Sequence, residues 1–161
     1  VNGAVVDGGR VYLTSDGTTI ESGHISVDYD GEPCACGARG CLETYVTALD
    51  GPNLEAGKWL FEGLGPALEA GDPKAEATLR EAALYLASAA RTVSRLIRPR
   101  AFLVVAVSDP VSETLARLVR ERLESSDSGF DRPAPIFEAR AYDPGLAQRG
   151  AADLVLDDFL G

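Results

Sequence analysis

The residues of this chain that are best suited to chemistry are gathered in one short segment. All three cysteines and the only histidine lie within residues 24–41, with the spacing H-x9-C-x-C-x4-C. Zinc prefers nitrogen and sulfur ligands in a tetrahedron, and one imidazole with three thiolates closes that shell without water. The spacing therefore predicts a structural rather than a catalytic zinc ion, held by His24, Cys34, Cys36 and Cys41.

Three other uses of these cysteines are open. A disulfide would pair two of them and leave the third alone, and an iron–sulfur cluster would normally need a fourth cysteine that the chain lacks. Burial as small apolar side chains fits Cys36 poorly, because this residue stands beside glycine in a segment with little to bury it. Zinc explains the cluster better than any of the three.

The elements that position this segment are predicted from periodicity and turn residues. Asp7-Gly8-Gly9 suits a hairpin turn, whereas residues 29–40 have no periodicity and need outside support. Strands are predicted at residues 1–14, as a hairpin, and at 24–28, 101–107 and 136–141. Helices are predicted to begin near Leu42 and near Leu54, and to span residues 73–97, 110–123 and 144–160. Residues 125–132 are predicted to form a loop.

The second half of the chain alternates strands with helices, which predicts a parallel α/β arrangement. The apolar run 101–107 is short and continuous, as expected of a strand covered on both faces. Three helices are preceded by an Asp-Pro pair, in which aspartate caps the exposed amides and proline fits the first helical position. The long helix 73–97 presents apolar residues at steps of three and four, which predicts a core face made of Leu79, Ala83, Leu86, Ala90, Val93 and Ile97.

Composition bounds the class of protein. With 161 residues, 45% hydrophobic and 25% charged, the chain is expected to be one globular domain. A net charge of −10 opposes a polyanion, so this segment is not expected to contact nucleic acid. No apolar run approaches the roughly 20 residues of a membrane helix, and no signal peptide is evident, so we expect a cytoplasmic protein with no membrane contact.

The chain contains no methionine and begins inside a predicted strand, which indicates that upstream sequence is missing.

The motifs E-S-G-H at residues 21–24 and G-E-P-C-A-C-G-A-R-G-C-L-E-T-Y at residues 31–45 resemble those of the ROK family, which contains glucokinase-type sugar kinases and sugar-responsive repressors. A weaker resemblance extends over nearly the whole chain, to the run Arg149-Gly150-Ala151-Ala152 near its end.

The resemblance implies an α/β fold of the actin-like, hexokinase-like (ribonuclease H-like) type, with a mixed sheet, flanking helices and a zinc-bound loop. Residues 1–161 would form the carboxyl-terminal lobe, with zinc and sugar bound by segment 21–45, and the amino-terminal lobe would be absent. Family members commonly form homo-oligomers, so we expect one here. The catalytic aspartate of the kinases would lie in the absent lobe, so this fragment holds no catalytic residue.

The same resemblance implies that Glu21, His24 and Glu43 contact the hydroxyls of a hexose or hexose derivative. A carboxylate can accept hydrogen bonds from adjacent hydroxyls, and His24 could bind zinc through one ring nitrogen and donate from the other. From the residues alone, Glu21 would be a solvated loop residue. Glu43 would be a favourable charge in the first turn of a helix.

Two departures from the kinases bear on function. Asn2 stands where kinases usually have glycine, and Ala106, Val107 and Ser108 stand where kinases place paired glycines beside the adenosine. A side chain there blocks the close approach of a nucleotide. We therefore favour the sugar-sensing domain of a transcriptional regulator, with DNA bound by an upstream domain. The alternatives are half of an ATP-dependent sugar kinase and a zinc-stabilised module with no ligand.

Overall fold

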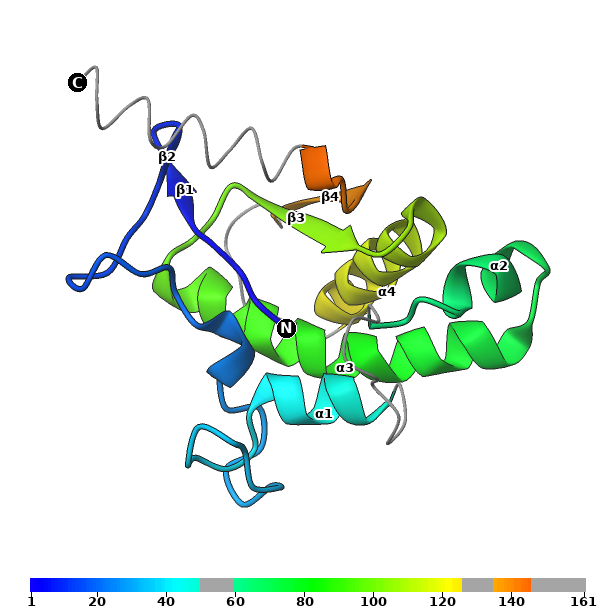
Figure 1. Ribbon diagram of the computed structural model, residues 1–161, viewed down its shortest axis with the longest axis horizontal. Coiled ribbons are helices and arrows are strands. Elements are labelled where there is room, and N and C mark those ends of the chain that lie inside the picture. Colours follow the sequence, from blue (N-terminus) through cyan, green and yellow to red (C-terminus); the bar gives the residue numbers. More distant parts are fainter. Residues whose placement is uncertain (50–59, 126–134, 146–161) are drawn as a thin grey trace.

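The computed structural model describes residues 1–49, 60–125 and 135–145 (Figure 1). Its elements are β1 (Val6–Asp7), β2 (Arg10–Val11), the 3-10 turn η1 (Ser22–His24), α1 (Leu42–Ala48), α2 (Leu64–Glu69), α3 (Pro73–Leu96), β3 (Ala101–Ala106), α4 (Asp109–Ser125) and β4 (Ile136–Ala141). The order agrees with the predicted alternation of strand and helix in the second half. It adds α2, which the sequence did not predict.

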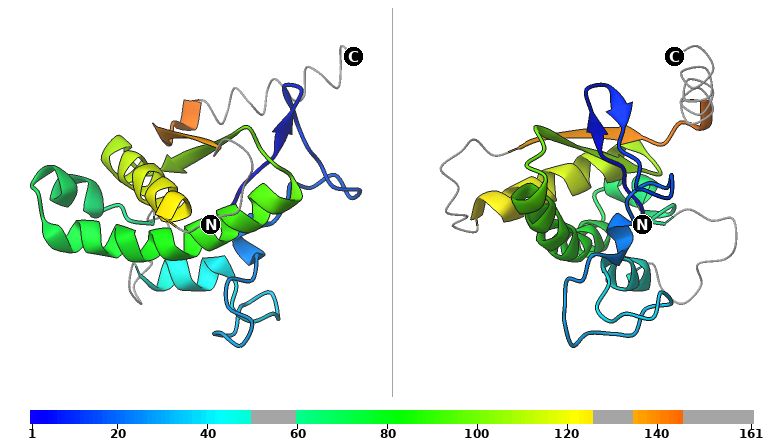
Figure 2. Two further views of the ribbon diagram at one scale, coloured as in Figure 1. Left: turned by 180° about the vertical axis from the view of Figure 1, so that it is seen from behind. Right: turned by 90° about the vertical axis from the view of Figure 1, so that its left-hand side faces the viewer.

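The helices and strands are stacked in layers around α3 (Figures 1 and 2). Helix α4 packs between α3 and the sheet formed by β3 and β4, while α1 packs against α3 on its other side. Helix α2 contacts both α3 and α4. The long helix is therefore the platform that holds the segment with the cysteines, through α1, in a fixed place.

The core lies where α1, α3 and α4 meet. Leu79 of α3 and Val111 of α4 are fully buried, and Leu42 and Val46 of α1 are almost so. The predicted core face of the long helix is confirmed at Leu79, Ala83, Leu86 and Ala90. It is wrong at its end, because α3 stops at Leu96 and Ile97 is 46% exposed.

Strands β3 and β4 are parallel and pair in register from Ala101↔Ile136 to Ala106↔Ala141, as predicted. Phe102 and Phe137 stack across the pair, with ring centroids 5.1 Å apart. The expectation that β3 is covered on both faces is wrong for the described residues, because α4 covers one face only. Val105 is 52% exposed on the other face. Neighbouring apolar residues of both strands are also exposed there.

The predicted amino-terminal hairpin is confirmed, although its strands are short. β1 and β2 are antiparallel, and Gly8 and Gly9 take positive φ angles of 57° and 84° in the turn. Within the described residues these strands form a sheet separate from β3 and β4, rather than one mixed sheet. The strand predicted at residues 24–28 is reduced to a single bridge between Ser26 and Cys41, and its first residue, His24, belongs to the turn η1.

The Asp-Pro pairs serve different purposes. Asp72 caps α3 as predicted, since its Oδ1 accepts a hydrogen bond from the Lys74 amide at 2.9 Å. Asp109 instead belongs to α4, and its Oδ1 accepts from the Ala141 amide at 2.9 Å, which joins the start of α4 to the end of β4. That second pair is a tertiary contact, so its interpretation as a cap was wrong.

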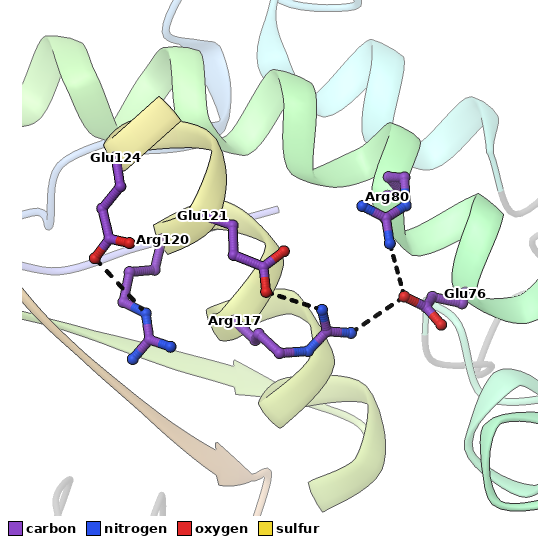
Figure 3. A network of polar contacts seen from close by, with 6 residues as sticks. All are labelled: Glu76, Arg80, Arg117, Arg120, Glu121 and Glu124. Atoms are coloured by element: carbon purple, nitrogen blue, oxygen red, sulfur yellow. Dashed lines mark hydrogen bonds and ion pairs between the residues drawn. The ribbon is translucent and has the colours of Figure 1, made fainter. Parts of the chain in front are cut away.

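Ion pairs join α3 to α4 on their exposed faces (Figure 3). Glu76 accepts hydrogen bonds from Arg80 on its own helix, at 2.8 Å, and from Arg117 on α4, at 3.3 Å. Arg117 also donates to Glu121 at 3.1 Å. Such exposed pairs contribute about 0–1 kcal/mol each, so the buried contacts of Leu79 and Val111 hold the two helices together.

Several predicted elements fall outside the described residues. They are the helix near Leu54, residues 126–132 of the predicted loop, and the helix at 144–160 beyond its first two residues, including the Arg149-Gly150-Ala151-Ala152 run. Among the helices of residues 1–49, 60–125 and 135–145, none combines the length and the apolar character needed to cross a membrane.

Candidate metal centre

The four predicted metal ligands come from three neighbouring pieces of backbone. His24 is the last residue of η1, and Cys41 is the residue that precedes α1. The backbone that follows His24 runs antiparallel to the backbone at Cys41. Ser26 bridges Cys41, and the Leu42 amide donates to the Ile25 carbonyl at 2.9 Å. The chain between them, residues 28–41, is called the metal loop below.

Cys34 and Cys36 lie at the tip of the metal loop, in a tight turn. The Cys34 amide donates to the Ala38 carbonyl at 2.9 Å, and the Gly37 amide donates to the Cys34 carbonyl at 3.0 Å. Gly37 takes a φ of 91°, a backbone conformation that residues with a Cβ rarely adopt, so the turn depends on glycine at this position. The turn folds Cys34 and Cys36 back toward the base of the loop, where Cys41 lies.

The ligand atoms of His24, Cys34, Cys36 and Cys41 all lie within 4.8 Å of one another. The Cys34 Sγ is 3.6 Å from the His24 Nδ1, and the Cys36 Sγ is 3.6 Å from the Cys41 Sγ. With zinc–ligand bonds of about 2.0–2.3 Å, the edges of a tetrahedron are about 3.3–3.8 Å long. Two of the pairs have this spacing, and the four atoms lie close enough together to hold a metal ion.

Two alternative uses of the cysteines fit less well. All three cysteines are free, and the 3.6 Å between the Sγ atoms of Cys36 and Cys41 is far beyond the roughly 2.05 Å of a disulfide. Burial as apolar side chains applies to Cys41 only, because Cys36 is exposed. The predicted grouping is confirmed, and its donor set fits zinc.

Without a cation, the thiols have very different acidities. The pKa of Cys34 is lowered to about 6, first because the Cys36 amide hydrogen-bonds to it and next because the Thr44 hydroxyl does. Burial raises the pKa of Cys41 to about 12. Cys34 therefore loses its proton more readily than Cys41, and metal binding by Cys41 would require the loss of its proton.

The residues expected to meet sugar lie next to this cluster. Glu43 is in the first turn of α1, and a Cβ on Gly23 of η1 would be only 3.3 Å from its Oε2. The backbone nitrogen of Val1 lies 3.0 Å from the same oxygen. Glu21 is exposed at the start of η1, and its side chain makes no capping bond. The structure thus brings Glu43 beside the turn that ends in His24, with Glu21 at the other end of that turn.

Two residues of the site were missed by the sequence analysis. The Thr44 hydroxyl helps to lower the pKa of Cys34, and Tyr45 bonds to the metal loop. Tyr45 lies in α1 only four residues after Cys41, and this closeness in sequence was the signal that could have found it.

The segment after β3 is packed with side chains. The Ala106 carbonyl accepts from the Tyr142 amide at 2.7 Å, and Val107 packs against the core. The Oγ of Ser108 is buried, with no hydrogen-bond partner among the described residues, and a Cβ on Gly65 of α2 would be 2.7 Å from it. Ser108 therefore fills the space beside α2.

The metal loop and the fold around it agree with one family, whose ROK family model matches residues 1–158. The chain belongs to the ROK family. Over 48 residues it is 42% identical to a glucokinase of Thermotoga maritima, a match covering 30% of this chain and 15% of that protein. Over 40 residues it is 45% identical to the DNA-binding transcriptional dual regulator NagC of Escherichia coli K12, covering 25% of this chain and 10% of that protein.

Solved structures of ROK proteins are similar over most of the chain. A ROK hexokinase from Thermus thermophilus is 27% identical, with a TM-score of 0.58 over 86% of this chain and 47% of that one. A ROK transcriptional regulator homologous to the E. coli MLC protein is 25% identical, with a TM-score of 0.61 over 86% of this chain and 38% of that one. The chain thus spans less than half the length of either, and its relatives include both kinases and regulators.

Proposed function

We propose that this chain is the sugar-sensing effector domain of a ROK transcriptional regulator, in which a structural zinc ion braces the sugar site. The observation that carries the proposal is the position of Glu43 beside the turn that ends in His24. Glu43 offers a hydrogen-bond acceptor beside this turn, and His24, at the end of the turn, belongs to the group of side chains that could hold a metal ion.

The roles follow from the chemistry of each group. The His24 Nδ1 faces Cys34, and a ring that gives Nδ1 to a metal carries its proton on Nε2, which can donate to a sugar hydroxyl. Glu43, and in our proposal Glu21, would accept hydrogen bonds from neighbouring hydroxyls. Zinc, when bound, would fix the tautomer and the direction of the imidazole ring.

The choice of a sensor over a kinase depends on the segment after β3. Ala106, Val107 and Ser108 carry side chains where kinases place paired glycines, and Ser108 is packed against α2. Glycine lets backbone approach a nucleotide closely, and each added Cβ prevents this. A chain that keeps the sugar-facing residues and lacks the glycines suits a protein that binds sugar without using ATP.

The second candidate is the carboxyl-terminal half of an ATP-dependent sugar kinase. It is supported by the similarity to the Thermotoga glucokinase, although NagC is similar to a comparable degree. Kinases and regulators therefore share matching segments of this size, and such a match does not separate them. A kinase would take its catalytic aspartate from sequence outside this chain.

For the whole regulator, we propose that sugar binding shifts the balance between two conformations that differ in DNA affinity. The net charge of −10 places DNA contact on another domain, since phosphate binding requires cations. Homo-oligomer formation is part of the same proposal, because symmetric operators suit paired domains.

The test compares sugar and ATP binding by the full-length protein. We expect calorimetry to detect glucose, N-acetylglucosamine or xylose without ATP, and to detect no binding of an ATP analogue under the same conditions. A coupled assay that measured ATP-dependent phosphorylation of a hexose would refute the sensor and establish the kinase.

The sugar contact is tested by Glu43→Gln in the full-length protein. Hydrogen bonds to a charged group contribute about 1.5–3 kcal/mol, so affinity for the sugar should fall about 10- to 100-fold. Zinc content should be unchanged, because Glu43 is not among the four ligands. Glu113→Gln, which makes the same change of charge at an exposed site on α4, is the control and should bind sugar normally. Equal affinities for the two variants would rule out the contact.

A further inference from the structure

Tyr45 joins α1 to the metal loop through its hydroxyl group. The hydroxyl donates to the Asp28 Oδ2 at 3.0 Å and accepts from the Glu32 amide at 3.2 Å. Asp28 and Glu32 lie on either side of the turn with which the loop begins, where the Gly31 amide bonds to the Asp28 carbonyl at 3.2 Å. One phenol therefore bridges both sides of this turn.

The contact is close enough to require glycine. A Cβ on Gly31 would lie 2.0 Å from the Tyr45 hydroxyl, well inside any van der Waals contact. The phenol oxygen thus occupies the space where another residue would carry a side chain. The fit indicates that the loop and the phenol are packed together, and are not merely neighbours on the surface.

The metal loop has few other attachments to the body of the protein. Between residues 28 and 39 each described side chain is exposed or half-buried, and burial begins only at Gly40 and Cys41. Backbone bonds such as the one from the Gly40 amide to the Glu32 carbonyl, at 2.8 Å, hold the loop to itself. Tyr45 is therefore a side chain of α1 that ties the start of the loop to the helices.

On its other side, the Tyr45 ring is anchored to the long helix. Its ring stacks on that of Tyr85 of α3, with centroids 4.6 Å apart and planes inclined by 17°. α3 also carries the core, and α1 packs on it through Leu42 and Val46. The stack fixes the direction of the phenol, so the hydroxyl meets the loop at a defined point.

We propose that the Tyr45 hydroxyl is a positioning group that holds the metal loop against α1, and so sets how fast a bound metal ion leaves. The proposal rests on the zinc site proposed above. Cys34 and Cys36 can leave the ion only if the loop tip moves away from His24 and Cys41, which are fixed to η1 and α1. Loosening the start of the loop makes that movement easier.

The variant Tyr45→Phe removes the hydroxyl and keeps the ring stack. Tyr85→Phe is the matched control, because it removes the other hydroxyl of the same stack, for which no bond to the metal loop is observed in the described part of the chain. Asp28→Ala removes the acceptor from the loop side, whereas Asp28→Asn keeps an acceptor oxygen and should restore much of the effect. Asp28 is exposed, so its replacement does not disturb the core.

The main measurement is the rate at which the full-length protein loses zinc to a chromogenic chelator. We expect Tyr45→Phe and Asp28→Ala each to lose zinc about tenfold faster, with no further increase in the double variant, because both remove one shared hydrogen bond. Tyr85→Phe should stay within about twofold of the unmodified protein. Equal acceleration by both tyrosine variants, or by neither, overturns the proposal.

A second measurement separates this proposal from the zinc site itself. In metal-free protein, hydrogen exchange should be faster at the Glu32 amide in Tyr45→Phe than in Tyr85→Phe, because the amide loses its acceptor. If the unmodified protein holds no zinc, the zinc proposal fails and this exchange rate alone decides the role of Tyr45. Unchanged exchange at Glu32 would then refute it.

Discussion

Gly40 is the position where the structure predicts the sharpest response to a single methyl group. It lies at the base of the metal loop with a φ of 69°, and a Cβ there would be 1.5 Å from the Asp28 carbonyl oxygen. Ordinary contact begins at 3.4 Å, so Gly40→Ala must separate the two sides of the loop by about 2 Å. That separation carries Cys41 away from the loop tip.

The expected cost has two parts. A left-handed backbone costs a residue with a Cβ about 1–2 kcal/mol. The separation also breaks the bonds from the Val27 amide to Gly40 and from the Gly40 amide to Glu32, both 2.8 Å long, at about 1 kcal/mol each. Gly37 also has a positive φ, of 91°, but a Cβ there would have nothing within 4 Å. Gly37→Ala should therefore cost only the first part.

The assay is urea unfolding of both variants, with and without a strong chelator, together with zinc content by elemental analysis. We expect Gly40→Ala to lower the free energy of unfolding by about 3–4 kcal/mol and to lose zinc, and Gly37→Ala to lower it by about 1–2 kcal/mol and to keep zinc. If the two variants were equally stable and equally loaded, the close approach at Gly40 would have no energetic consequence and the reasoning would be wrong.

Two further predictions concern the metal and the core. Cys36→Ser should release zinc and speed hydrogen exchange across the metal loop, which has little core of its own; thermal stability that is the same with and without chelator in the unmodified protein would contradict this. Leu79→Ala should destabilise the protein by about 2–5 kcal/mol in denaturant unfolding, because Leu79 is fully buried between the helices, whereas Leu84→Ala, 44% exposed on the same helix, should cost far less.

The grouping of the candidate metal ligands could be predicted from sequence because all three cysteines and the only histidine lie in one short segment. The long helix could be predicted because its apolar periodicity and the cap at Asp72 agree, and the strand Ile136–Ala141 because its apolar residues alternate from Phe137 onward. Local signals of this kind do not depend on what lies nearby in space. The alternation of strands and helices along the chain also predicted that β3 and β4 are parallel.

The remaining features depend on contacts between distant residues. The hydrogen bond from the Ala141 amide to Asp109 could not be predicted from the Asp-Pro pair, because tertiary packing decides which amide meets the carboxylate. The apolar run of β3 indicates a strand but not how many of its faces are covered. Tyr45 could not be assigned a role, because its partners Asp28 and Glu32 are placed by the folding of a loop that has no periodicity.

The candidate metal centre and the proposed sugar site would share backbone as well as the His24 ring. Cys41 is two residues before Glu43, with α1 beginning between them, and His24 ends the turn against which Glu43 lies. Binding equilibria that are coupled in this way are reciprocal, so any factor by which zinc raises the affinity for sugar must also be the factor by which sugar raises the affinity for zinc. We therefore expect saturating sugar to tighten zinc binding in a chelator competition, and expect Glu43→Gln to reduce that effect. Zinc affinity that does not change on sugar saturation would mean that His24 does not serve both sites.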